Sequence, residues 1–269
     1  MPSTYDVINP ANESIVETVN LLSLEETDAV IAKAAKAFES WKNVAPGERA
    51  RLLRAFSQVV TDHREELAQL EITNSGHTRG NALWEADNVA NTLMYYAAAP
   101  ERLFGRQIPV PGGIDVTFKE PLGVVGVIVP WNFPMPIASW GFSAALAAGN
   151  TVVIKPSEKD PSASMWIAKL WKEAGLPDGV FNVLNGDKES VDGLLNSPDV
   201  ESISFVGSTP IAQYIYESAS RSGKRVQALG GAKNHMVVMP DADIDQAVDA
   251  LIGAAYGSAG ERCMAISVA

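Results

Sequence analysis

Residues 122–155 read LGVVGVIVPWNFPMPIASWGFSAALAAGNTVVIK, and this stretch decides the fold. Residues 124–129 form a short apolar run rich in valine, which predicts a buried strand. Residues 137–148 then have the length and apolar character of a helix, and residues 151–154 begin a second buried strand. A strand, a helix and a second strand in this order are typical of a βαβ unit with parallel strands.

The same alternation continues toward the C-terminus. It predicts an α/β fold, a Rossmann-like doubly wound parallel sheet with helices on both faces. The expected strands are residues 181–184, 203–206, 226–229 and 235–239, and the expected helices are residues 163–174, 188–195, 211–222 and 244–256.

The N-terminal part has a different pattern. Residues 5–22 contain turn residues and predict a short strand or hairpin, and residues 116–118 predict another strand. Ser23 and Glu26 have the spacing of a capping box, and one amphipathic helix follows as far as Trp41. Apolar stripes predict a second helix over residues 46–73 and a third over residues 81–98. We expect an N-terminal helical layer whose stripes, with Trp84, Val89, Leu93 and Tyr96 on the third helix, form core.

Composition restricts the class of function. The chain has 269 residues, a formal net charge of −11 and 46% hydrophobic residues. Acidic proteins are repelled by nucleic acids and anionic membranes, so neither is expected as a partner. The longest apolar stretch, residues 122–131, is about half of a membrane span, and no signal peptide is recognised. The single cysteine, Cys263, cannot form an internal disulfide, which favours a cytoplasmic location. No residues are assigned to a metal.

Three of the predicted strands end in loops that carry polar chemistry. These loops are residues 130–134 (PWNFP), 155–158 (KPSE) and 207–210 (GSTP). Parallel strands place their carboxyl ends at one edge of the sheet, where ligands bind in this class of fold. We therefore expect the three loops to lie close together.

Each of these loops has two interpretations. Lys155 and Glu158 could bind the hydroxyl groups of a ribose, and the alternative is a turn whose charges are solvated. Gly207 and Ser208, at a helix start, are suited to phosphate, or form an ordinary turn with Ser208 or Thr209 as N-cap. The Asn132 amide can donate to a developing oxyanion, or satisfies turn backbone.

Residues 257–263 (GSAGERC) bring the cysteine into a segment of small residues. Such residues give access to the thiol, and Arg262 beside it favours a lowered thiol pKa. The alternative is a buried structural cysteine.

Together these motifs resemble the aldehyde dehydrogenase superfamily in order and approximate spacing, from Asn9 to Cys263. The motifs are residues 130–134, 155–158, 205–209, 229–231 and 260–263. The resemblance implies that Cys263 is the nucleophile and Asn132 the oxyanion donor. It also implies an NAD site, to which we assign Val129, Pro130, Trp131, Lys155, Glu158, Gly207, Ser208 and Leu229.

Two branches of the family are represented. From about Glu158 onward the chain resembles methylmalonate-semialdehyde dehydrogenases, which are CoA-acylating; this implies that Arg262 binds a substrate carboxylate. Ala228 stands where most hydrolytic members have the glutamate that activates water. The first half resembles general aldehyde dehydrogenases, and Asn88 stands where the branch has a second arginine. This is the pattern of a natural mosaic or a chimera joined near residues 155–160.

The resemblance also implies a domain division. Residues 1–257 are expected to form the NAD-binding domain and residues 258–269 the start of a catalytic domain, because family members are nearly twice as long. The expected function is oxidation of a small-molecule aldehyde through a cysteine thioester, released to CoA or water, in a full-length form that is a homo-oligomer. The alternative is a cofactor-binding fragment without turnover.

Overall fold

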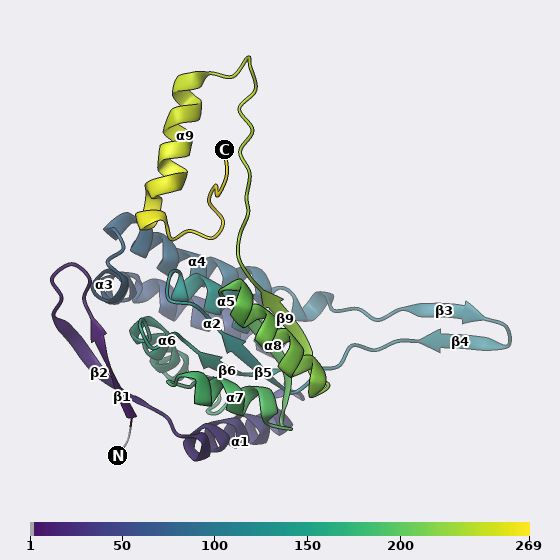
Figure 1. Cartoon of the computed structure of the whole chain (residues 1–269). Helices are drawn as coiled ribbons and strands as arrows, with labels where there is room; N and C mark the ends of the chain where they lie inside the picture. Colours follow the sequence, from purple (N-terminus) through teal and green to yellow (C-terminus); the bar gives the residue numbers. More distant parts are fainter. Residues whose placement is uncertain (1–2) are drawn as a thin grey trace.

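The computed structural model describes residues 3–269, and its centre is a parallel five-stranded sheet (Figure 1). The strand order is β7-β6-β5-β8-β9. Strand order therefore reverses between β5 and β8, and ligands bind beside such a switch point in doubly wound folds. The bounds are β5 (Val124–Ile128), β6 (Thr151–Lys155), β7 (Phe181–Val183), β8 (Val200–Val206) and β9 (Arg225–Leu229). The predicted α/β fold is confirmed.

Helices cover both faces of this sheet. On one face α2 and α4 to α6 pack in a core with Phe56, Leu93 and Val127. On the other face α1, α7 and α8 pack in a second core with Ile31, Ile128 and Ile215. The bounds are α1 (Leu24–Trp41), α2 (Pro46–Asp62), α4 (Arg79–Ala97), α5 (Pro134–Ala147), α6 (Ser162–Glu173), α7 (Lys188–Asn196) and α8 (Thr209–Arg221).

The expected N-terminal helical layer is therefore divided. The first helix, α1, begins with the predicted Ser23–Glu26 capping box, but it lies across the sheet from α2 and α4. The apolar stripe of a helix shows that it has a buried face, and it does not show which side of the sheet that face covers.

The predicted helix over residues 46–73 is two helices. Helix α2 ends at Asp62, and α3 (Arg64–Ser75) begins after His63, whose backbone leaves helical geometry at φ −99° and ψ 17°. The His63 ring lies 2.8 Å from Glu66 on α3 and 3.0 Å from Glu173 on α6. These side-chain contacts hold the bend, while the apolar stripe continues on both sides of it.

Two strand predictions also need correction. The strand expected at residues 116–118 is β4 (Gly113–Val116), which pairs with β3 (Gln107–Val110) in a hairpin that projects from the body (Figure 1). Residues 235–239 are not a strand, because only a single bridge joins His235 to Val268. Here the β-branched residues have no neighbouring strand with which to form a ladder.

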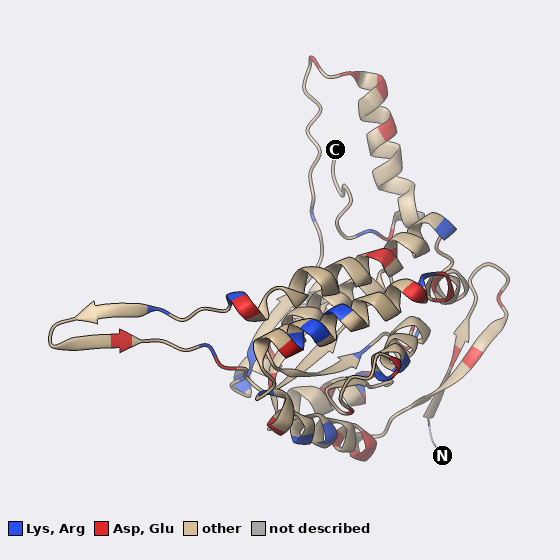
Figure 2. Ribbon diagram, turned by 180° about the vertical axis from the view of Figure 1, so that it is seen from behind, with Lys and Arg blue, Asp and Glu red and all other residues tan. Residues whose placement is uncertain are grey.

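The remaining elements frame this body. The predicted N-terminal hairpin is confirmed as β1 (Ser3–Ile8) paired with β2 (Ile15–Leu21). Helix α9 (Ile244–Tyr256) has no buried residue, and the short helices are η1 (Pro100–Arg102) and η2 (Gly257–Gly260). Figure 2 shows acidic and basic residues interspersed along the helices that cover the sheet. Within residues 3–269, no helix is both long and apolar enough to cross a membrane.

Candidate active site

The three chemically suggestive loops lie at one edge of the sheet, as predicted. Strand β5 is hydrogen-bonded to β6 on one side and to β8 on the other, and both pairs are parallel. Beyond β5, the Val129 N–H donates to the Lys155 carbonyl at 3.1 Å. Beyond β8, the Gly207 N–H donates to the Leu229 carbonyl at 3.0 Å. Val129 is buried, whereas Trp131, Ser208 and Leu229 reach the surface of this edge.

Lys155 is the last residue of β6, and it is only 6% exposed. Its Nζ lies 3.2 Å from Glu158 Oε2 on the following turn. The Lys155 ammonium group is therefore not a solvated charge, and this excludes the alternative that Lys155 belongs to a turn with solvated charges. A buried ammonium beside a carboxylate offers donors and acceptors together, and this is the combination that vicinal hydroxyl groups bind.

The Gly207 turn opens directly into α8. Ser208 is at the N-cap position, but its side chain caps no described N–H of the helix. The Thr209 hydroxyl instead accepts the Gly231 N–H at 2.9 Å. A Cβ at Gly207 would lie 2.5 Å from the ring of Phe205, so packing requires this glycine whether or not a ligand binds. The first N–H groups of α8 remain suited to an anion.

Cys263 is exposed, so the alternative of a buried structural cysteine is wrong. Three amide side chains from distant parts of the chain hold its segment. Asn234 donates to the carbonyls of Cys263 at 2.9 Å and Ala265 at 2.6 Å. The amide of Asn81 on α4 donates to the Ser258 hydroxyl at 2.6 Å. The sequence predicts no site role for Asn81 or Asn234. Their hydrogen-bond partners are distant in the sequence, and no local pattern identifies such an asparagine.

Asn132 is the third amide. Its Nδ2 donates to the carbonyl of Glu261 at 2.6 Å, two residues before the cysteine. The PWNFP loop is thus joined to the cysteine segment. An amide nitrogen carries two N–H groups, so this bond leaves the second one for a ligand.

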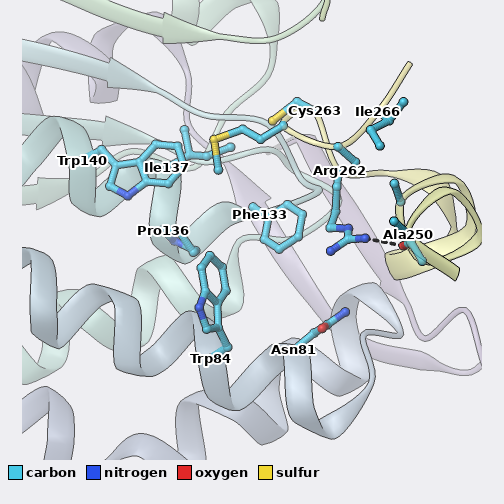
Figure 3. A pocket seen from close by; sticks show the side chains of 14 residues that line it. Asn81, Trp84, Phe133, Pro136, Ile137, Trp140, Ala250, Arg262, Cys263 and Ile266 are labelled. Carbon is cyan, nitrogen blue, oxygen red and sulfur yellow. Dashed lines mark hydrogen bonds between the residues drawn. The ribbon is translucent and has the colours of Figure 1, made fainter. Parts of the chain in front are cut away.

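Arg262 turns toward α9. Its Nη2 donates to the Gly253 carbonyl at 2.5 Å, and its Nε is buried with no partner in the described part of the chain. Figure 3 shows this guanidinium beside Ala250, on the same pocket wall as Ile266.

A pocket of about 830 Å³ lies between these elements (Figure 3). Cys263 and Arg262 form one side, and Trp84, Phe133 and Trp140 form an aromatic side. The ring centroids of Trp84 and Phe133 are 6.2 Å apart in an edge-to-face pair. The Trp140 Nε1 donates to the Asn88 side chain at 3.1 Å. Asn88 thus holds an aromatic wall.

The prediction that Trp84 belongs to the core is wrong, because it is 47% exposed. The spacing of the buried residues on this helix already indicates that Trp84 is not among them. Val89 and Leu93 are four residues apart and fully buried, and extending this spacing backward reaches Glu85. Trp84 therefore lies off the buried stripe.

The strand order and the loops at this edge define a Rossmann-like α/β protein with an exposed cysteine near the carboxyl ends of its parallel strands. The model of the aldehyde dehydrogenase family matches residues 1–269. The chain therefore belongs to the aldehyde dehydrogenase family, as the resemblance of its motifs predicted.

Similar proteins match along almost the whole chain. A malonate-semialdehyde dehydrogenase of Pseudomonas aeruginosa is 49% identical over 98% of this chain and 54% of its own length. A methylmalonate-semialdehyde dehydrogenase from Oceanimonas doudoroffii has a similar structure, with a TM-score of 0.95, 47% identity and coverage of 98% and 55%. A structure from Sinorhizobium meliloti, assigned to the same activity and complexed with NAD, has a TM-score of 0.95, 42% identity and coverage of 98% and 54%. The chain spans about half the length of these relatives.

Proposed function

We propose that this chain belongs to an NAD-dependent enzyme that oxidises an aldehyde through a thioester on Cys263. The observation that carries the proposal is the exposed Cys263 on the wall of a pocket, in a segment bonded to the Asn132 loop. The thiolate is the reactive form of cysteine, and it adds to the aldehyde carbon as the carbonyl oxygen gains negative charge. The free N–H of Asn132 and the Cys263 backbone N–H are the donors proposed for that oxygen.

The residues at the sheet edge fit a dinucleotide. Lys155 and Glu158 would bind the hydroxyls of the adenosine ribose, and Gly207 and Ser208 would lie by the pyrophosphate at the start of α8. Val129, Pro130, Trp131 and Leu229 would line the remainder of the site. When bound there, NAD would supply the acceptor for the hydride of the aldehyde carbon. In support, the similar structure from Sinorhizobium meliloti is complexed with NAD.

Glu158 should make the site prefer NAD to NADP. A 2′-phosphate beside its carboxylate meets like charge, which the neighbouring Lys155 only partly offsets. Calorimetric titration of the chain with each cofactor tests this assignment, with Glu158→Gln as the variant and Glu25→Gln, at an exposed glutamate on α1, as the control. We expect tighter NAD binding by the wild type and a smaller preference in Glu158→Gln. Equal affinities for both cofactors in the wild type would show that Glu158 does not face the ribose.

For the acyl acceptor we propose CoA. Ala228, on β9 opposite Phe205, carries no base, although a well-placed general base accelerates proton transfer from water about 10²–10⁴-fold. A thiol reaches its thiolate more easily than water reaches hydroxide. A substrate carboxylate would bind Arg262, in keeping with the semialdehyde activity named for the relatives.

The test is NADH formation from malonate semialdehyde and from propanal, with and without CoA, in the wild type and in Ala228→Glu. We expect acyl-CoA as the product and a faster CoA-free reaction in Ala228→Glu. A CoA-free reaction that is already fast with Ala228 excludes CoA as the required acceptor. Cofactor binding without NADH formation under any condition favours the alternative, a binding module without turnover.

We further propose that the enzyme assembles with copies of itself. The β3–β4 hairpin projects from the body and exposes Ile108, Ile114 and Val116, and exposed apolar surface of this kind is typical of interfaces. Light scattering should show an oligomer, and Ile114→Asp should shift it toward the monomer. A monomeric wild type at micromolar concentration would contradict this assignment.

A further inference from the structure

A cluster of ionisable side chains is buried below the PWNFP loop, separate from the site described above. Glu71 on α3, Glu85 on α4, His77 between these helices and Asp160 before α6 are each 5% exposed or less. Helices α3 and α4 lie side by side in Figure 1. The His77 ring packs on Phe133, with centroids 5.2 Å apart.

The side chains of Glu71, His77 and Glu85 converge on one small region. His77 Nδ1 lies 2.6 Å from Glu85 Oε1 and 3.5 Å from Glu71 Oε1, and one ligand atom from each residue lies within 4.8 Å of the other two. Donor atoms bound to one tetrahedral ion through bonds of about 2.0–2.1 Å lie roughly 3.3 Å apart. The His77–Glu71 separation is close to this value. The Glu85 side chain must withdraw by roughly 0.7 Å to reach it.

Several polar atoms of the cluster have no hydrogen-bond partner among residues 3–269 while its carboxyl groups are ionised, although a protonated carboxyl group would join Glu71 to Asp160. They are both carboxylate oxygens of Glu71, Nε2 of His77, one oxygen each of Glu85 and Asp160, and the amide oxygen of Asn74. Buried polar atoms of this kind are normally paired. Glu71 is the clearest case, because its fully buried side chain leaves both carboxylate oxygens unpaired beside the His77 ring.

The charges of the cluster are unbalanced. A protonated His77 can neutralise Glu85, with which it is in contact. Burial raises the pKa of Glu71 and of Asp160 and so favours their uncharged forms. When all three carboxyl groups are ionised, they carry more negative charge than one protonated His77 can neutralise, and isolated buried charge is strongly unfavourable. A bound cation would both pair the free oxygens and balance the charge.

We propose that Glu71, His77 and Glu85 bind a divalent transition-metal cation, with Asp160 supplying a further oxygen. One imidazole combined with several carboxylates suits Mn²⁺ or Zn²⁺. A cavity of about 640 Å³, lined by residues 75–78 and by Tyr256 and Glu261, reaches His77 and gives the ion a path of entry. The ion would join α3 to α4 beneath Phe133, and so support the loop that carries Asn132.

The test is titration of the chelator-treated wild-type chain with Mn²⁺, followed by calorimetry and by electron paramagnetic resonance. Mn²⁺ is the probe because the exposed Cys263 thiol also binds Zn²⁺. We expect one ion per chain and a Tm that rises by several degrees on binding. Glu71→Gln and His77→Gln should each weaken binding at least tenfold. Glu65→Gln, an exposed site on the same helix, should bind as the wild type does.

The proposal fails if the wild type binds no Mn²⁺ at millimolar concentration, or if both variants bind it unchanged. It also fails if infrared spectra show a protonated carboxylic acid that persists after Mn²⁺ is added, because protons then neutralise the cluster. If Glu71→Gln does not fold, the titrations of the wild type and of His77→Gln still test whether the cluster binds a cation. None of these measurements depends on the proposed oxidation of aldehydes.

Discussion

Asn234→Ala tests how the cysteine segment is held in place. The substitution removes two hydrogen bonds, from the Asn234 amide to the carbonyls of Cys263 and Ala265. The backbone bonds from Ser267 and Val268 to the Asn234 carbonyl do not involve the side chain and should remain. The segment should therefore loosen around Cys263 and stay attached beyond it.

The expected loss of local stability can be estimated from the exposure of these two hydrogen bonds. A net protein hydrogen bond contributes about 0.5–1.5 kcal/mol, and exposed ones such as these belong in the lower half of that range. Losing both costs about 1–2 kcal/mol of local stability, which is roughly a 5- to 30-fold larger population of the open segment. The global free energy of unfolding should change little, because Asn234 and Cys263 belong to neither hydrophobic core.

The assay is hydrogen exchange of peptides from residues 261–269, together with the rate of Cys263 alkylation by iodoacetamide. Both rates should rise in Asn234→Ala. Asn43→Ala is the control, since it removes an amide-to-carbonyl bond, to Glu39, far from the cysteine. Unchanged exchange near Cys263 would refute the reasoning, and so would a loss of global stability as large as the local effect.

Three other outcomes follow from the packing and the charges. Phe56→Ala, at a fully buried ring in the core beneath the sheet, should lower the free energy of unfolding by about 3–5 kcal/mol in urea titrations; a loss below about 1 kcal/mol would contradict the packing. Two glutamates hydrogen-bonded to His63 raise its pKa. A raised folded-state pKa stabilises the fold below the unfolded value of about 6.5, and this contribution is lost as pH rises through the folded value. The difference in free energy of unfolding between wild type and His63→Gln should therefore be larger at pH 6 than at pH 9. Equal differences at the two pH values would exclude the ion pairs of His63 with Glu66 and Glu173. Asn88→Leu should change Trp140 fluorescence while leaving the unfolding midpoint nearly unchanged, and an unaltered spectrum would show that the bond does not hold the ring.

Several features of this protein could be predicted from sequence because they are properties of short segments. The apolar runs of β5 and β6 are buried along their whole length, which is why they are recognisable as strands of a parallel sheet. The capping box at Ser23 needs only residues three apart. Parallel strands share one edge for their carboxyl ends, so the convergence of the Asn132, Lys155 and Gly207 loops followed from the alternation of elements.

Tertiary structure alone decided which residues face one another across the chain. Trp84 faces a pocket and Glu85 is buried because helix α4 is rotated by its packing against α2, α3 and α5. Asn81 and Asn234 reach the cysteine segment over 177 and 29–31 residues, and Glu71 meets His77 and Asp160 only where three elements pack. The sequence by itself determined most of the helices and strands, the order of the sheet motifs and the family. The side of the sheet that each helix covers, and the polar groups buried together there, depend on the free energy of packing the whole chain, which no local pattern contains.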